Sequence, residues 1–295
     1  MPEAALIEIG SAELSAAINP YGAELTHLRD ADGRELMTDA DPAFWTGHAP
    51  ILFPIVGALN DDTLRLDGES YTMGKHGFAR RSTFAVVEQS ATRAVFLLDD
   101  SAETRAVYPR AFALRLTFSI DGATLSITAE IENRETERTL PASFGFHPAF
   151  AWPLPYGESR AEHRIVFAAD EPEPLRELTP GGLITAQERP SPLDADRTLH
   201  LRDDLFADDA LIWDGVRAQS VRYGAETGPQ LRVDFPDTPM LGIWTKPGAA
   251  YICIEPWHGI ADPEGFTGDF TAKPGVFALA PAKTKTIAIH VTLEP

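Results

Sequence analysis

Two short segments of the chain carry side chains that could transfer protons. Residues 143–150 place His147 after two aromatic residues and before a proline, and residues 253–259 place Glu255 directly after an apolar run. A histidine and a carboxylate are the side-chain types that concerted acid and base catalysis uses at neutral pH. A carboxylate at the end of a buried strand is costly unless it has a partner, and desolvation raises its pKa toward that of a general base. His147 taken alone also fits a core histidine held by a backbone group.

A third segment, residues 75–81, adds His76 with the cations Lys75, Arg80 and Arg81 around it. It combines a hydrogen-bond donor, the ring of Phe78 and a fixed charge. This combination suits a sugar, because hydroxyls need directed hydrogen bonds while C–H faces pack on aromatic rings. A solvated basic turn fits the same residues equally well.

Metal binding and glycoside hydrolysis fit these residues less well. The spacing of Glu255 and His258 suggests a metal site completed by His147 or His76. However, the proline after Glu255 and the glycine after His258 argue against a helix that would present both ligands on one face. We therefore predict a site without a metal.

Glycoside hydrolysis usually needs two carboxylates, whereas the best partner of Glu255 is a histidine.

The single cysteine and one acidic pair are weaker candidates. Cys253 is the only cysteine, which excludes an intramolecular disulfide and a multi-thiolate zinc site. Its apolar neighbours predict a buried strand residue rather than a nucleophilic thiol. Asp209, beside Asp208, has the type of side chain that holds a hydroxyl, although most acidic pairs in loops are only hydrated.

The charge of the chain narrows the range of partners. Its 295 residues contain 44 acidic and 25 basic side chains, a formal net charge of −19. Such an excess repels phosphate backbones and anionic lipids, which argues against nucleic-acid and membrane roles. The sequence shows neither a basic region followed by an apolar stretch at its start nor an apolar run of membrane-spanning length. We therefore expect a cytoplasmic protein.

Strand periodicity dominates the chain. Apolar and polar residues alternate over 112–120 and again over 125–131, and the Asp121-Gly122 pair between them favours a tight turn. The same construction recurs around Asp67-Gly68 and around Asp214-Gly215. Each of these three segments predicts an antiparallel hairpin.

The remaining pattern predicts one large all-β domain. Residues 287–293 alternate and should close a sheet, whereas only 41–45 and 109–111 could form single helical turns. The proline-rich and acidic region 171–202 is expected to be a long surface connection, with a strand pattern resuming after it. We therefore predict an antiparallel β-sandwich with few short helices that spans residues 1–295 as a single domain.

Five motifs in a fixed order resemble the aldose 1-epimerase (mutarotase) family, and in particular its LacX-like branch. They are PILFPIVG at 50–57, HGFAR at 76–80, FGFHP at 144–148, DALI at 209–212 and IEPW at 254–257. The resemblance spans nearly the whole chain. It implies that family's galactose mutarotase-like β-supersandwich.

The resemblance also implies roles for individual residues. Glu255 matches the general base that takes the proton of the anomeric hydroxyl, and His147 matches the general acid that protonates the ring oxygen. His76 matches a histidine that hydrogen-bonds the sugar, and Arg80 and Asp209 fall at positions similar to substrate contacts. The implied reaction interconverts the anomers of an aldohexose without a metal, nucleotide or covalent intermediate.

The chain departs from the family after Gly57. Relatives often carry a basic residue there, whereas Ala58 stands at this position. A sugar or phosphate contact is therefore either absent or supplied by Arg80 or Arg81. A hexose-6-phosphate 1-epimerase and a sugar-binding or sensing module without turnover are the two alternatives, in a monomer or a homodimer.

Overall fold

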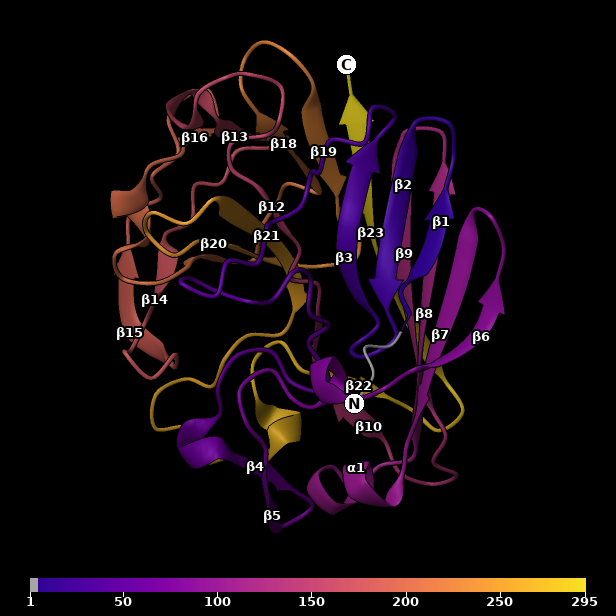
Figure 1. The fold of residues 1–295 in the computed structure, drawn as a ribbon. Coiled ribbons are helices and arrows are strands. Elements are labelled where there is room, and N and C mark those ends of the chain that lie inside the picture. Colours follow the sequence, from indigo (N-terminus) through magenta and orange to yellow (C-terminus); the bar gives the residue numbers. More distant parts are fainter. Residues whose placement is uncertain (1–4) are drawn as a thin grey trace.

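Antiparallel strands make up most of the computed structural model, which describes residues 5–295 (Figure 1). The larger of two main sheets has nine strands. In spatial order they are β16 (Thr198–His200), β13 (Arg164–Phe167), β18 (Ser220–Gly224), β19 (Gln230–Asp234), β23 (Thr284–Glu294), β9 (Thr124–Asn133), β8 (Phe112–Asp121), β7 (Arg93–Asp99) and β6 (Ala85–Gln89).

The second main sheet has seven strands and carries the candidate site. Its order is β11 (Phe144–Gly145), β21 (Tyr251–His258), β20 (Met240–Trp244), β17 (Leu211–Asp214), β14 (Leu175–Leu178) and β15 (Ile184–Arg189), and β12 (Ala149–Ala151) also pairs with β21. Figure 1 shows β20, β21, β14 and β15 on the left and β6–β9 on the right.

Three small sheets complete the β-structure. They are β1 (Ile7–Gly10), β2 (Leu14–Asn19) and β3 (Glu24–Asp30); β10 (Leu140–Ala142) and β22 (Phe277–Leu279); and β4 (Thr63–Leu66) and β5 (Glu69–Thr72). The one α-helix of the described residues, α1 (Ala102–Val107), starts with a capping box formed by Ser101 and Thr104. Single 3₁₀ turns occur at Asn60–Asp62, Ala79–Arg81, Arg160–Glu162, Asp203–Phe206 and Phe270–Ala272.

Two of the three predicted hairpins are confirmed. β8 and β9 pair across Asp121-Thr124, and β4 and β5 pair across Leu66-Glu69. The all-β class with large antiparallel sheets is confirmed as well. The predicted strand 287–293 lies within β23, which pairs with both β19 and β9 in the interior of the sheet.

The hairpin predicted at Asp214-Gly215 is wrong, because the flanking strands β17 and β18 belong to different sheets. The amides of Gly215 and Val216 donate to the carbonyl of Pro239, and the amide of Ala218 donates to the carboxylate of Glu171. The Asp-Gly pair therefore begins a longer connection between the two sheets. A turn signal alone does not decide which strands pair.

The region 171–202 contains more regular structure than a surface connection. β14 and β15 form a hairpin at the edge of the seven-stranded sheet, and β16 forms the edge of the nine-stranded sheet. The predicted helical turns at 41–45 and 109–111 are not helices: the former contains turns and the latter has no regular secondary structure.

A shared apolar core lies between the two main sheets. β21 contributes Ile252 and Ile254 to the same buried cluster as Ile127 of β9 and Ile289 of β23. Because side chains alternate along a strand, the intervening residues of β21 face the other way. This second face of β21 forms the floor of the candidate site. None of the helices among residues 5–295 has the length and hydropathy needed to span a bilayer.

Candidate active site

A cavity of about 270 Å³ opens over the outer face of the seven-stranded sheet. This volume accommodates one pyranose ring. All five predicted site residues line it: Glu255, His147, His76, Arg80 and Asp209. The other lining residues are Trp45, Val56, Gly57, Lys75, Leu178, Gly182, Ala210, Ile212, Trp244, Trp257 and Ala261.

Glu255 extends from the middle of β21 into the base of the cavity. It pairs in register with Gly242 of β20, and only 2% of its surface is exposed. Burial raises the pKa of Glu255 well above its ordinary value; nearby Lys75 opposes this shift and Asp209 adds to it. Burial therefore favours the protonated, uncharged form of this side chain.

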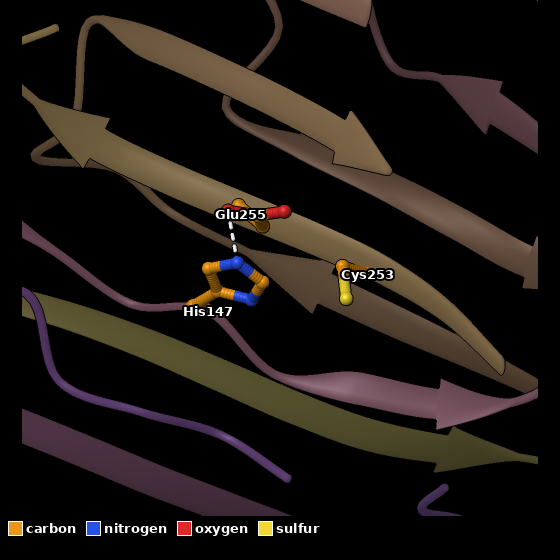
Figure 2. A group of neighbouring side chains, drawn as sticks. All are labelled: His147, Cys253 and Glu255. Atoms are coloured by element: carbon orange, nitrogen blue, oxygen red, sulfur yellow. Dashed lines mark ion pairs between the residues drawn. The ribbon is translucent and has the colours of Figure 1, made fainter. Parts of the chain in front are cut away.

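His147 follows β11 and approaches Glu255 from the opposite side of the cavity base. Its Nε2 lies 3.1 Å from Oε2 of Glu255, as the dashed line in Figure 2 shows. Burial lowers the pKa of His147 to about 3, and the positive charges of Lys75 and Arg80 act in the same direction. The imidazole is held between aromatic rings, with centroids 5.0 Å from Trp45 and 6.0 Å from Trp244.

The pKa shifts of Glu255 and His147 together determine which forms of the two side chains burial favours. A carboxyl group that holds its proton faces an imidazole that is neutral. Burial thus favours the two uncharged forms, and the 3.1 Å contact is short enough for a single proton to pass between the two groups. A shared proton between two oxygen- or nitrogen-bearing groups is what a reaction needs when one group gives a proton while the other takes one.

His76 is presented by a strained backbone. Its φ of 68° lies in the left-handed region, and its Nδ1 accepts a hydrogen bond from the amide of Gly57 at 3.1 Å. That bond makes Nδ1 the acceptor, so the neutral ring carries its proton on Nε2. Burial lowers the pKa of His76 well below its ordinary value, as does the neighbouring His147. His76 is thus a neutral donor in the cavity wall.

Position 57 accepts only glycine. Its φ is 74°, and an added Cβ would lie 2.6 Å from Cα of Ala261. The two loops of the cavity wall approach each other at Gly57 and Ala261. A buried ion pair between Asp262 and Lys273, with 3.1 Å between Oδ1 and Nζ, lies behind them.

Arg80 and Lys75 bring positive charge to the cavity without a carboxylate partner. Nη2 of Arg80 donates to the carbonyl of Lys75 at 2.9 Å, and the buried Nε of Arg80 has no hydrogen-bond partner within residues 5–295. Neither side chain forms an ion pair with the described acidic residues. Arg81 is not among the lining residues, and Ala58 is buried beneath the cavity wall.

Asp209 lines the cavity with a φ of 81°, another left-handed conformation. Its Oδ1 accepts a hydrogen bond from the amide of Ala210 at 2.8 Å, which fixes the carboxylate. The other oxygen is left for a ligand hydroxyl. The cavity lining therefore contains a positioned acceptor in addition to the donors His76 and Arg80.

Trp257 fills space that two glycines leave open. An added Cβ on Gly242 would lie 2.4 Å from the indole, and one on Gly145 would lie 2.6 Å from it. The indole Nε1 is buried and has no hydrogen-bond partner in the described part of the chain. Trp257 therefore offers an apolar surface to a bound molecule, while its indole N–H acts on Glu255 and lowers the pKa of that carboxyl against the larger effect of burial.

The sequence did not predict several residues of the cavity. Trp45 and Trp244 cover His147 from segments with no distinctive pattern, and Leu178 and Gly182 come from the β14–β15 hairpin. The position of Cys253 is also new: its sulfur, a ring nitrogen of His147 and a carboxylate oxygen of Glu255 lie within 4.8 Å of one another. The period-two alternation of β21 could have placed Cys253 and Glu255 on one face.

The metal site considered for Glu255 and His258 is not formed. The two residues are three positions apart on one strand, so their side chains lie on opposite faces. His258 packs against Phe277, with ring centroids 5.0 Å apart, and does not line the cavity.

Known proteins resemble the chain over nearly its full length. The sequence model of a family described as aldose 1-epimerase matches residues 5–273. The chromosomal protein LacX of Lactococcus lactis subsp. lactis is 32% identical, an alignment that covers 97% of this chain and 99% of that protein.

Solved structures agree with the sequence comparison. A galactose mutarotase related enzyme from Lactobacillus acidophilus is 31% identical with a TM-score of 0.90, over 98% of this chain and 97% of that chain. A galactose mutarotase-like protein from Lactobacillus casei ATCC 334 is 29% identical with a TM-score of 0.90, over 98% and 100% of the two chains.

Proposed function

Because the chain belongs to the aldose 1-epimerase family, we propose that it interconverts the α and β anomers of an aldohexose, with Glu255 and His147 as the acid–base pair. The observation that carries this proposal is the 3.1 Å contact between the two side chains at the base of a cavity of pyranose size. His76, Arg80 and Asp209 supply hydrogen bonds to the sugar hydroxyls, and Trp257 packs against a C–H face.

Ring opening moves two protons in opposite directions. The reactive form of the pair has an ionised Glu255 and a protonated His147, which it reaches when the shared proton crosses to the imidazole. Glu255 then takes the proton of the hydroxyl on C1 while His147 gives its proton to the ring oxygen. The C1–ring oxygen bond breaks, and an aldehyde forms at C1.

Anomer exchange follows from the reverse steps. Rotation about the C1–C2 bond exposes the other face of the aldehyde to the C5 hydroxyl. His147 takes the proton of that hydroxyl as it attacks C1, and Glu255 protonates the new anomeric oxygen. The protein ends in the state in which it began, and the sugar is the other anomer.

Burial favours the state that ring opening produces. After opening, Glu255 is protonated and His147 is neutral, and desolvation stabilises these uncharged forms. The apolar surroundings therefore lower the free energy of the opened intermediate relative to the charged pair.

A direct assay tests this proposal against a binding module without turnover. Pure α-glucose or α-galactose is dissolved, and its conversion is followed by polarimetry or NMR with and without protein. Acceleration over the spontaneous rate supports the enzyme. Saturable sugar binding by calorimetry with no acceleration of any anomer would favour the binding module.

The unpaired cations support a second candidate substrate, a hexose 6-phosphate. Lys75 and Arg80 line the cavity of a strongly acidic chain and form no ion pair with an acidic residue of 5–295, and an arginine can hold a phosphate through two hydrogen bonds. The comparison of kcat/KM for a free hexose and its 6-phosphate decides between the two. Arg80→Gln, with Arg65→Gln outside the cavity as a control, should lower kcat/KM for the phosphate more than for the free sugar.

A further inference from the structure

Cys253 lies on the cavity side of β21, beside the acid–base pair. Tyr251, Cys253, Glu255 and Trp257 alternate with core residues of the same strand, so these four side chains share one face. The thiol is buried, and burial raises its pKa well above its ordinary value. Figure 2 shows His147 on the side of β21 to which the sulfur points.

We propose that Cys253, His147 and Glu255 form a binding site for a borderline-soft divalent cation, with Zn²⁺ as the preferred ion. One ligand atom from each residue lies within 4.8 Å of the other two. Sulfur, imidazole nitrogen and carboxylate oxygen are the three donor types that zinc takes in proteins. Three protein ligands leave a fourth position, which opens on the cavity and takes a water molecule or a sugar hydroxyl.

The histidine is free to serve as a ligand. His147 is 8% exposed, its Nδ1 has no hydrogen-bond partner in the described residues, and its Nε2 has only the contact with Glu255. No other side chain therefore has to give up a hydrogen bond to the ring when an ion binds. The nitrogen that contacts Glu255, Nε2, is the ligand atom, and because Nδ1 is unpartnered within residues 5–295 the ring can shift toward an ion without breaking another hydrogen bond.

The distances allow the three ligands to close on an ion. Tetrahedral zinc sites, with bonds of about 2.0–2.3 Å, place neighbouring ligand atoms about 3.4–3.6 Å apart. The Glu255–His147 contact of 3.1 Å is slightly shorter than this separation, so these two groups have to move apart by about 0.3–0.5 Å, whereas the outer limit of 4.8 Å for the cluster requires a side-chain shift of about 1 Å toward the ion. Binding breaks the S–H bond of Cys253 and releases that proton, together with the one shared by Glu255 and His147, to solvent.

An ion at this site blocks the proposed reaction. It occupies the lone pairs of Glu255 and His147 that the proton transfers need. The proposal that zinc inhibits the enzyme therefore depends on the proposed function, whereas the proposal that the site binds zinc does not. Mg²⁺ prefers oxygen ligands in an octahedral arrangement and should neither bind there nor inhibit.

Cobalt tests the site without any assay of activity. Co²⁺ is titrated into the wild-type protein and into Cys253→Ala, and thiolate-to-cobalt charge-transfer absorption is recorded in the near ultraviolet. Since the chain has one cysteine, the band reports Cys253 alone. We expect a band that saturates at one ion per chain and that Zn²⁺ displaces. The absence of a band in a folded wild-type protein would overturn the proposal.

Inhibition provides the second readout. Zn²⁺ should slow anomer interconversion by the wild type, and Cys253→Ala should raise the half-inhibitory concentration at least about tenfold, with each protein compared with its own activity without zinc. Cys253→Ser preserves the shape of the side chain and serves if the alanine variant folds poorly. Equal inhibition of the wild type and both variants would place the zinc elsewhere and overturn the proposal. A protein with no activity at all would refute the proposed function. The cobalt band would still show whether Cys253 takes part in binding an ion.

Discussion

The amide of Gly57 donates a hydrogen bond to Nδ1 of His76, and this single contact fixes which nitrogen of the ring faces the cavity. The protonated Nε2 can then donate to a sugar hydroxyl but cannot accept from one. Because the pKa of His76 is well below its ordinary value, the ring stays neutral at physiological pH. The orientation of the ring is therefore set by the backbone before any ligand binds.

His76→Ala should raise KM more than it lowers kcat, because the donor contacts the sugar but takes no part in the proton transfers. The loss of one hydrogen bond to a bound ligand costs about 0.5–1.5 kcal/mol, a rise in KM of a few fold to about tenfold. His76→Gln retains a donor and should recover part of the loss. A fall in kcat of about 10²-fold with unchanged KM would instead place His76 in the chemistry.

Gly242→Ala should disturb the site through Trp257. The new Cβ would lie 2.4 Å from the indole, so the ring has to move toward the cavity. Overpacking of this kind costs about 1–3 kcal/mol of stability, and the displaced ring should raise KM. Thermal unfolding and steady-state kinetics measure both effects. Gly181→Ala is the control, since its Cβ would meet only Thr179 Oγ1 at an ordinary 3.6 Å; similar behaviour of the two variants would contradict the account.

The value of kcat/KM should not show the fall near pH 6.5 that protonation of an ordinary histidine would cause as the pH is lowered. The pair is active while it holds one proton, and it gains a second only when His147 protonates, near pH 3. The raised pKa of Glu255 keeps the shared proton in place well above pH 4.5. Activity should therefore not fall as the pH is lowered from 7 to 5, while circular dichroism shows a folded protein. A fall in that interval with a midpoint near 6.5 would show that the imidazole is not desolvated.

Glu255→Gln should leave the protein as stable as the wild type or make it more stable at neutral pH. A carboxyl whose pKa is raised by folding stabilises the native state only below its unfolded-state pKa, and it costs stability as the pH rises above that value. Each unit of the raised pKa corresponds to about 1.4 kcal/mol, and glutamine removes this cost. Urea unfolding at pH 5 and pH 7 should show the advantage of the variant growing with pH. A less stable variant at pH 7 would indicate that Glu255 is held as a favourable ion pair.

Local patterns predicted strands better than their partners. Alternation and an Asp-Gly pair were sufficient for β8 and β9, where the two strands are also neighbours in space. The same signal failed at Asp214-Gly215, because pairing of β17 with β20 and a long connection to the other sheet decide the topology there. Which distant strands pair with each other depends on the packing of the whole core, and the residues of one local turn do not determine it.

The candidate site was predictable where chemistry and the family resemblance coincided. The types of His147 and Glu255 suggested acid–base chemistry, but their contact depends on how β11 and β12 pair with β21. Trp45 carried no signal because only the tertiary fold brings its loop over the imidazole. Cys253 is a buried strand residue, as its apolar neighbours predict, and alternation along β21 places it on the same face as Glu255.

The most direct test of the acid–base pair is kcat/KM for anomer interconversion in a double-mutant cycle of Glu255→Gln and His147→Asn. Exposed Glu264→Gln and His200→Asn are the matched controls. Because the two groups act on one shared proton, each single variant should lose about 10²-fold to 10⁴-fold, and the double variant should lose little more than either. Full activity in Glu255→Gln, or losses that multiply in the double variant, would contradict the account.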